Sequence, residues 1–153
     1  MKANEAEGWI ERLGLEPHPE GGWYRRIYES DLKTEGGRPV MTSIYYLLEG
    51  DDFSALHRLK QDEQWNFYAG VPITIHEISA AGEYSSITLG DGNFQHTVRA
   101  GILFGATVAG DFALVGCTVV PGFDFADFEL PPRTQLLKEL PEYAELIERL
   151  TRV

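Results

Sequence analysis

The chain has 153 residues, with 13 Lys and Arg against 24 Asp and Glu and a formal net charge of −11. This acidic balance, with no clustered basic run, argues against binding to nucleic acid or anionic membranes, because both need concentrated Lys and Arg. The hydrophobic content of 43% suits one folded domain, while no apolar run is long enough for a membrane span and the first residues lack the apolar core of a signal peptide. Cys117 is the single cysteine, so we expect no intrachain disulfide and a cytoplasmic location. We interpret this thiol, which lies in an apolar run, as structural.

A short helix is predicted over residues 4–15, where apolar side chains recur at helical spacing and Gly14 supplies a stop. Residues 17–22 are too rich in Pro and Gly for regular structure. Ten short apolar or alternating runs follow, and we expect each to be a strand: 23–29, 42–48, 54–59, 64–68, 73–78, 84–89, 94–98, 102–109, 113–120 and 123–128.

Short Gly- and Asp-rich turns separate several of these runs, and no helix is expected between them. This pattern predicts an all-β fold, a closed antiparallel sandwich or barrel. Residues 141–153 return to helical spacing. We therefore expect a single domain over 1–153, comprising an N-terminal helix and loop (1–22), a β-barrel (23–130) and a C-terminal helical tail (131–153).

One stretch matches the first sequence motif of cupins, in which His57, Glu63 and Gly70 stand at the motif positions with six residues between the last two. Gly101 keeps one position of the second motif. Together with these, segments 18–24, 42–48 and 120–125 resemble an uncharacterised family of single-domain cupins from bacteria and fungi, known as the fifth cupin family. The resemblance covers nearly the whole chain. It implies a small double-stranded β-helix, or jelly-roll barrel, that forms a homodimer and has no established activity.

Metal-binding cupins hold their ion with three His and one Glu that point into the barrel. The resemblance maps these positions onto His57, Leu59, Glu63 and Phe104 of this chain. Two of the four are apolar and cannot coordinate, so we expect no metal and no other cofactor. A metal-dependent oxygenase or isomerase remains an alternative, with water or an unexpected residue, such as His76 or His96, as the missing ligand.

A pocket for a small molecule is the function that these residues favour. Strand alternation places Glu63, Trp65 and Phe67 on one face, and His57 on the same face as Leu59. In cupins this face is the barrel interior, so the resemblance implies apolar walls of Leu59, Trp65, Phe67 and Phe104 around two polar groups. A polar or anionic metabolite is the expected ligand.

His57 and Glu63 are the candidate catalytic pair, because a carboxylate can fix the tautomer of an imidazole that acts as a base. Metal-independent cupins that epimerise nucleotide-linked sugars use such a pocket His, so an epimerase or isomerase is one hypothesis. Tyr45, Tyr46 and Tyr68 stay open as the partner acid. The alternative is a non-catalytic binding or sensing module, in which His57 and Glu63 only satisfy each other.

The loop that enters the first long strand is a second candidate region. His18 and Glu20 lie in it, and loops at a barrel mouth commonly carry binding residues. Arg25 and Arg26 follow directly and either could pair with an anion, although a solvated edge is the simpler interpretation.

Overall fold

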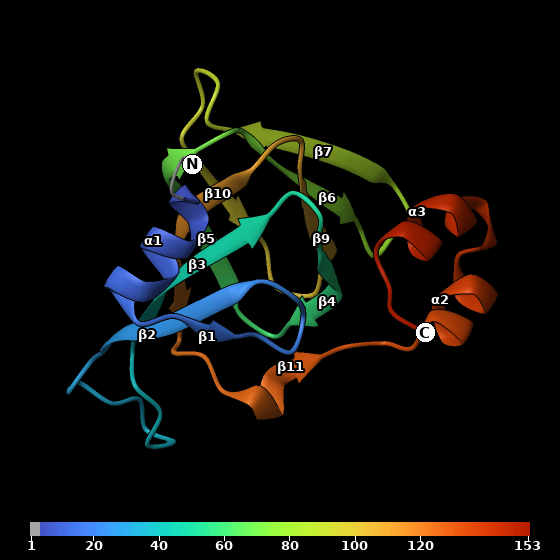
Figure 1. Cartoon of the computed structure of the whole chain (residues 1–153). Coiled ribbons are helices and arrows are strands. Elements are labelled where there is room, and N and C mark those ends of the chain that lie inside the picture. Colours follow the sequence, from blue (N-terminus) through green and yellow to red (C-terminus); the bar gives the residue numbers. More distant parts are fainter. Residues whose placement is uncertain (1–3) are drawn as a thin grey trace.

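Two antiparallel sheets pack face to face in the computed structural model, which describes residues 4–153 (Figure 1). Residues 1–3 of the predicted N-terminal segment lie outside the described part of the chain. The first sheet has the order β1 (Glu16–Pro17), β2 (Trp23–Glu29), β3 (Thr42–Glu49), β10 (Phe112–Val120), β5 (Asp62–Gly70) and β8 (Gln95–Val98). The second has the order β11 (Phe128–Glu129), β4 (Ser54–Leu59), β9 (Leu103–Val108), β6 (Ile73–Ile78) and β7 (Tyr84–Leu89). This is a jelly-roll barrel, which confirms the predicted fold class.

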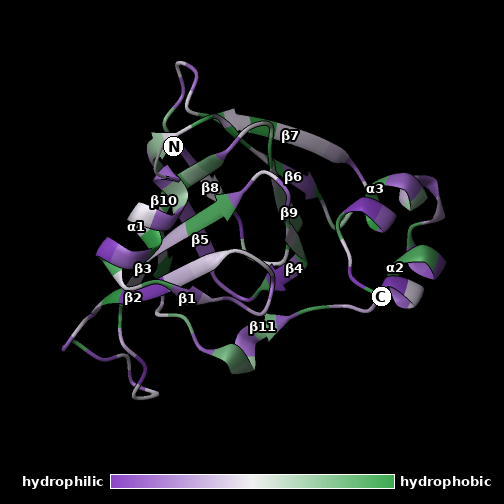
Figure 2. Ribbon diagram, viewed as in Figure 1, coloured by the Kyte–Doolittle hydropathy of each residue, from purple (hydrophilic) through white to green (hydrophobic). Residues whose placement is uncertain are grey.

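The main core fills the space between the sheets, where apolar side chains from both inner faces interdigitate. Figure 2 shows hydrophobic residues along β3 and β10 of the first sheet. Strand β3 shows the alternation clearly. Tyr46 and Leu48 point inward to this core, whereas Tyr45 and Leu47 point outward, where α1 (Glu5–Leu13) covers them. Both faces of β3 are therefore largely buried, which explains why its sequence is nearly continuously apolar.

Helix α1 forms where the sequence predicts it. The Asn4 side chain accepts a hydrogen bond from the Ala6 backbone N–H at 2.9 Å, and Gly14 ends the helix at a left-handed φ of 66°. Burial of Ala6 and the packing of Trp9 and Ile10 hold the helix on the outer face of the first sheet. No helix in residues 4–153 has both the length and the apolar character needed to span a membrane.

The C-terminal segment covers the outer face of the second sheet through α2 (Arg133–Glu139), a 3₁₀ turn (Pro141–Tyr143) and α3 (Ala144–Arg149). The apolar side chains that join it to the sheet are Leu136, Ile147 and Leu150 on the helices and Leu56, Ile78 and Leu103 on the strands. Both helices lie within the expected C-terminal helical tail of residues 131–153, although helical spacing is evident in the sequence only from residue 141 onward.

The strand expected over 123–128 is wrong. These residues cross the open end of the barrel as an irregular segment with a 3₁₀ turn (Phe125–Asp127), and only the two-residue β11 pairs with β4. The Asp124 carboxylate accepts a hydrogen bond from the Ala126 backbone N–H at 2.8 Å. An Asp side chain that satisfies the backbone locally in this way competes with strand pairing.

Candidate functional site

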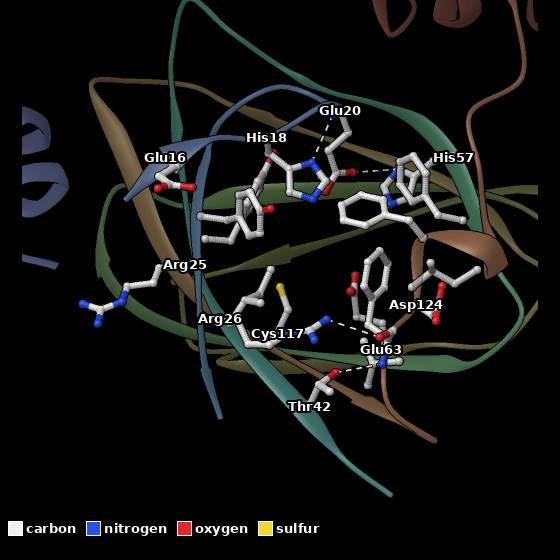
Figure 3. Close-up of a pocket in the computed structure, with 18 of the residues that line it drawn as sticks. Glu16, His18, Glu20, Arg25, Arg26, Thr42, His57, Glu63, Cys117 and Asp124 are labelled. Atoms are coloured by element: carbon white, nitrogen blue, oxygen red, sulfur yellow. Dashed lines mark hydrogen bonds and ion pairs between the residues drawn. The ribbon is translucent and has the colours of Figure 1, made fainter. Parts of the chain in front are cut away.

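A cavity of about 570 Å³ opens at the end of the barrel that residues 123–128 cross (Figure 3). Its walls come from β2, β3, β10, β4 and β5, and from the loops around residues 14–20 and 121–128. Its lining side chains are those of Glu16, His18, Glu20, Tyr24, Arg25, Arg26, Thr42, Ile44, Tyr46, His57, Leu59, Glu63, Cys117, Val119, Phe123, Asp124, Phe125 and Phe128. This volume suits a small metabolite, and the mixture of apolar walls and few buried polar groups is typical of ligand sites.

An ion pair between Glu20 and His57 lies in the buried part of the cavity. The Nδ1 of His57 is 2.9 Å from Oε2 of Glu20 and 2.7 Å from the carbonyl oxygen of Ala55. Both partners can only accept, so Nδ1 carries the hydrogen. The Ser54 hydroxyl donates to the same Glu20 oxygen at 2.7 Å and fixes the carboxylate.

The local backbone explains how a loop residue reaches this position. Gly21 and Gly22 have φ values of 105° and 78°, a region that other residues rarely adopt. A Cβ on Gly22 would also lie 2.6 Å from the Tyr46 hydroxyl oxygen. That hydroxyl donates to the Gly21 carbonyl at 2.6 Å, and the Glu20 carbonyl accepts from the Ala55 N–H at 2.7 Å. The loop is therefore pinned to the barrel on both sides of the carboxylate.

Opposite charges on the pair are the stable state. Burial opposes ionisation of Glu20, but the charge and hydrogen bond of His57 outweigh it and hold the pKa of the carboxyl below its ordinary value. Burial likewise disfavours the imidazolium of His57, but the charge and hydrogen bond of Glu20, with a smaller effect of Glu63, raise its pKa.

The second nitrogen of His57 faces the cavity. Its ring packs between Phe104 and Phe128, at centroid distances of 4.1 and 5.3 Å. Nε2 has no hydrogen-bond partner in residues 4–153. Among these residues, the side-chain polar atom that lacks a partner and is also sealed from solvent is Oε1 of Gln61, so Nε2 of His57 is not sealed. Nε2 of His57 is therefore open to the cavity and free to exchange a proton with a bound molecule.

His18 lies beside the pair in an uncharged state. Its Nδ1 accepts a hydrogen bond from the Glu20 backbone N–H at 3.1 Å, which leaves the hydrogen on Nε2. Burial lowers the pKa of His18, although Glu20 raises it in part. The ring meets Tyr24 edge to face at 4.6 Å, so His18 offers a neutral N–H donor within an aromatic wall.

Glu63 is the second buried carboxyl of the cavity, and it does not orient His57. Its Oε1 accepts a hydrogen bond from the Trp65 indole N–H at 2.8 Å. Burial and the negative charge of Glu20 raise its pKa to about 7, against the opposing effects of His57 and Trp65. The orienting role expected of Glu63 thus belongs to Glu20, whose loop position gave no periodic signal.

The other predicted site residues divide into three groups. His18, Glu20 and Leu59 line the cavity together with His57 and Glu63. Trp65 and Phe104 lie directly behind this surface, where Trp65 binds Glu63 and Phe104 packs on His57.

Phe67 and Tyr45 do not reach the cavity. Phe67 packs near Gly90 and Phe94, away from the open end. Tyr45 points to the outer face, where its ring centroid lies 6.2 Å from that of Tyr68. Of the three tyrosines left open as the acid, only Tyr46 lines the cavity. Phe128 and Ser54, which contact the ion pair, were missed.

A metal ion of the usual cupin type does not fit this site. Leu59 and Phe104 offer no donor atom at two of the four positions, so His57 and Glu63 are the two donors that remain of the usual set. His76 binds the hydroxyls of Tyr84 and Thr107, both at 2.8 Å, and His96 pairs with Glu77 at 2.5 Å. Neither histidine lines the cavity. Residues 4–153 hold no group of three or more His, Cys, Asp or Glu placed to bind a metal ion.

Comparison with known proteins gives a consistent picture. Residues 7–131 match the family described as Cupin superfamily (DUF985). The crystal structure of protein SO0799 from Shewanella oneidensis is similar, with 41% identity, coverage of 99% of both chains and a TM-score of 0.93. A hypothetical protein from Leishmania major is 35% identical over 97% of this chain and 99% of its own, with a TM-score of 0.90.

More distant similarity extends to an oxalate decarboxylase from Bacillus subtilis. It has 15% identity and a TM-score of 0.60, over 88% of this chain and 36% of that one, a likeness that concerns the fold alone. No curated protein matches the sequence significantly.

Proposed function

Because this chain belongs to the DUF985 family of the cupin superfamily, we propose that it binds a small anionic metabolite in the barrel and transfers a proton on it. The observation that carries the proposal is the buried pair of Glu20 and His57, whose Nε2 opens to a cavity of about 570 Å³. A binding surface alone does not require a carboxylate behind the histidine, whereas a proton-transfer group gains both its tautomer and its basicity from one.

The anionic end of the ligand is assigned to the mouth of the cavity. Arg26 lines this part, donates to the Phe123 carbonyl at 3.2 Å and lies 3.9 Å from the Glu29 carboxylate, which positions its guanidinium at the mouth (Figure 3). Arg25 extends away, and its guanidinium donates to the Leu13 carbonyl at 3.1 Å. Arg26 is therefore the cation we expect to contact a phosphate or carboxylate.

The proton is transferred at the buried end. With Nδ1 held by Glu20, neutral His57 presents the Nε2 lone pair to the ligand and becomes the paired imidazolium when it accepts a proton. Burial opposes the charge, but the charge and hydrogen bond of Glu20 raise the pKa of His57 and so stabilise the imidazolium that forms in this step. An isomerase or epimerase that acts at a carbon next to a carbonyl needs such a reversible base, without net redox chemistry.

Solvent exchange tests this proposal directly. We would incubate the protein in D₂O with small phosphorylated ketoses and nucleotide-linked 4-keto sugars and follow deuterium incorporation by NMR. His57→Asn should lower the exchange by about 10²–10⁴-fold, the usual contribution of a general base. His76→Asn is the matched control, since His76 lies outside the cavity.

Two outcomes would count against catalysis. Equal exchange in wild type and His57→Asn would contradict the role of His57. Stabilisation of the wild type against heat by these compounds, without any exchange, would instead support the non-catalytic binding module.

A homodimer and a cytoplasmic location complete the proposal. Beyond Tyr24, β2 has no neighbouring strand on its outer edge within residues 4–153, and Ile27 and Tyr28 on it are 44% and 49% exposed. An edge of this kind favours pairing with another chain. Sedimentation of wild type and Tyr28→Glu would test the dimer, and cell fractionation the location.

A further inference from the structure

We propose that Glu63 is a second catalytic residue, whose un-ionised carboxyl donates its proton to the carbonyl oxygen of the bound substrate. This inference rests on the proposed function and narrows it. The substrate class it assigns is an α-hydroxy aldehyde or ketone with an anionic group at the far end. His57 takes the proton from the carbon next to that carbonyl.

The geometry separates Glu63 from the other carboxyl of the cavity. Glu20 is held by His57 and Ser54, whereas Glu63 has one hydrogen bond, from Trp65 to Oε1. Glu63 makes no ion pair within residues 4–153, although its residue is only 8% exposed. Oε2 has no partner in that range and is not sealed from solvent, so it opens to the same cavity as Nε2 of His57.

The charges around Glu63 favour its neutral form. The ionised Glu20 lies within electrostatic reach, Cys117 is buried beside the cavity with its thiol held protonated, and His57 is the opposing cation. The charge and hydrogen bond of Glu20 outweigh burial and raise the pKa of His57, whereas burial and the charge of Glu20 together raise the pKa of Glu63. A histidine and an un-ionised carboxyl that open to one cavity can act as base and acid in the same step.

The reaction balances without an oxidant or metal. The C–H bond of the substrate breaks and its proton goes to Nε2 of His57, while its electron pair forms a carbon–carbon double bond. The π electrons of the carbonyl take the proton from Oε2 of Glu63, which leaves an enediol, a carboxylate on Glu63 and an imidazolium on His57. In the second half, His57 returns its proton to a carbon of the enediol while the Glu63 carboxylate takes the proton of one enediol hydroxyl, which re-forms a carbonyl. Protonation of the neighbouring carbon completes an isomerisation, and protonation of the first carbon on its other face completes an epimerisation.

The same charges select the substrate. A carboxylate at the reacting end would lie close to Glu20 and Glu63, and its charge would be opposed there by at least one of them. A carbonyl oxygen gains negative charge only as the reaction proceeds, and it then meets a proton donor. The permanent anion is accommodated at Arg26, at the mouth.

Glu63→Gln is the decisive substitution, because the glutamine carbonyl can still accept from Trp65 while the transferable proton is lost. In the D₂O assay with dihydroxyacetone phosphate and a nucleotide-linked 4-keto sugar, exchange should fall by about 10²–10⁴-fold. The apparent Kd of the same probes, measured from their stabilisation of the protein against heat, should change by less than about threefold. Glu63→Asp should recover part of the activity.

A second measurement needs no substrate. In protein labelled with ¹³C at the glutamate carboxyls, the Glu63 signal, assigned by its loss in Glu63→Gln, should titrate near pH 7. Titration below pH 5 would overturn the inference. Full exchange in Glu63→Gln, together with lost exchange in His57→Asn, would also overturn it, but the proposed function would then survive. If no probe exchanges in the wild type, the carbonyl class is wrong for both residues, and only ligand binding remains.

Discussion

Replacing Glu63 with Gln should make the protein more stable, and increasingly so as the pH rises. In the unfolded chain this carboxyl ionises near its ordinary pKa of 4.5, whereas in the folded protein its pKa is about 7. Between these values the folded state holds a proton that the unfolded state has released, so the free energy of unfolding falls with rising pH. At about 1.4 kcal/mol per pKa unit, the cost is about 3 kcal/mol above pH 7.

The variant escapes this cost because an amide does not ionise. The hydrogen bond from Trp65 remains available to the amide oxygen, so no compensating loss is expected on that side. We would measure urea unfolding by circular dichroism at pH 5 and pH 8 for the wild type, Glu63→Gln and Glu35→Gln. Glu35 is an exposed loop residue and serves as the control. The stability difference between Glu63→Gln and wild type should grow by about 2.5 kcal/mol from pH 5 to pH 8, because part of the cost is already present at pH 5.

An unchanged difference, within about 0.5 kcal/mol at the two pH values, would refute the reasoning, because this is the scatter of ordinary surface substitutions. It would mean that Glu63 ionises normally in the folded protein. His57 responds to Glu63, because burial lowers its pKa while the charges of Glu20 and, in smaller part, Glu63 raise it. Its signal should therefore be followed by NMR in both proteins, so that its contribution can be subtracted.

Three further predictions concern the loop and the pair. Glu20→Gln should lower the pKa of His57, measured by NMR titration of the ring protons, because the amide removes the charge that favours the imidazolium; an unchanged value would contradict the pairing. Gly21→Ala should destabilise the fold by about 1–3 kcal/mol in urea, because φ is 105° and a Cβ would meet the Phe53 carbonyl. Tyr46→Phe should cost about 1–3 kcal/mol by leaving the Gly21 carbonyl unpartnered, whereas Tyr45→Phe should cost little; equal losses would contradict this assignment.

The strands were predictable because their signals are local. Four of the ten expected runs have the observed bounds, namely 23–29, 54–59, 73–78 and 84–89, and five more differ at their ends. Alternation and turn residues suffice where one face is buried and the chain turns at Gly or Asp. The exception is 123–128, whose apolar residues suggest a strand but whose Asp124 satisfies the backbone locally.

The inward direction of individual side chains was harder to predict. Strand β3 is buried on both faces, so its sequence cannot say whether Tyr45 or Tyr46 points inward. The face of Phe67 was expected correctly, but alternation gives no depth along the barrel. Phe67 lies beyond Trp65 and packs against Phe94 instead of the ligand space.

The partner of His57 could not be found from spacing at all. Glu20 lies in an irregular loop 37 positions earlier, and only the folded path through Gly21 and Gly22 brings its carboxylate to the imidazole. Glu63 is nearer in sequence and stands at a motif position, but Trp65, two residues away on the same face, takes its Oε1. Proximity in sequence therefore favoured the wrong carboxylate as the orienter.

The two apolar substitutions in the cupin motifs explain how the site differs from a metal centre. Phe104 places a ring 4.1 Å from His57 at a position where a ligand would stand, and Phe128 closes the opposite side. The imidazole is thus held by packing and by Glu20, without any bond to its Nε2. Glu63 has no ion-pair partner within residues 4–153, so burial and the negative charge of Glu20 raise the pKa of its carboxyl. Loss of two ligands leaves a histidine and a carboxyl that face one cavity with their protons free to move, which is the arrangement that acid–base chemistry requires.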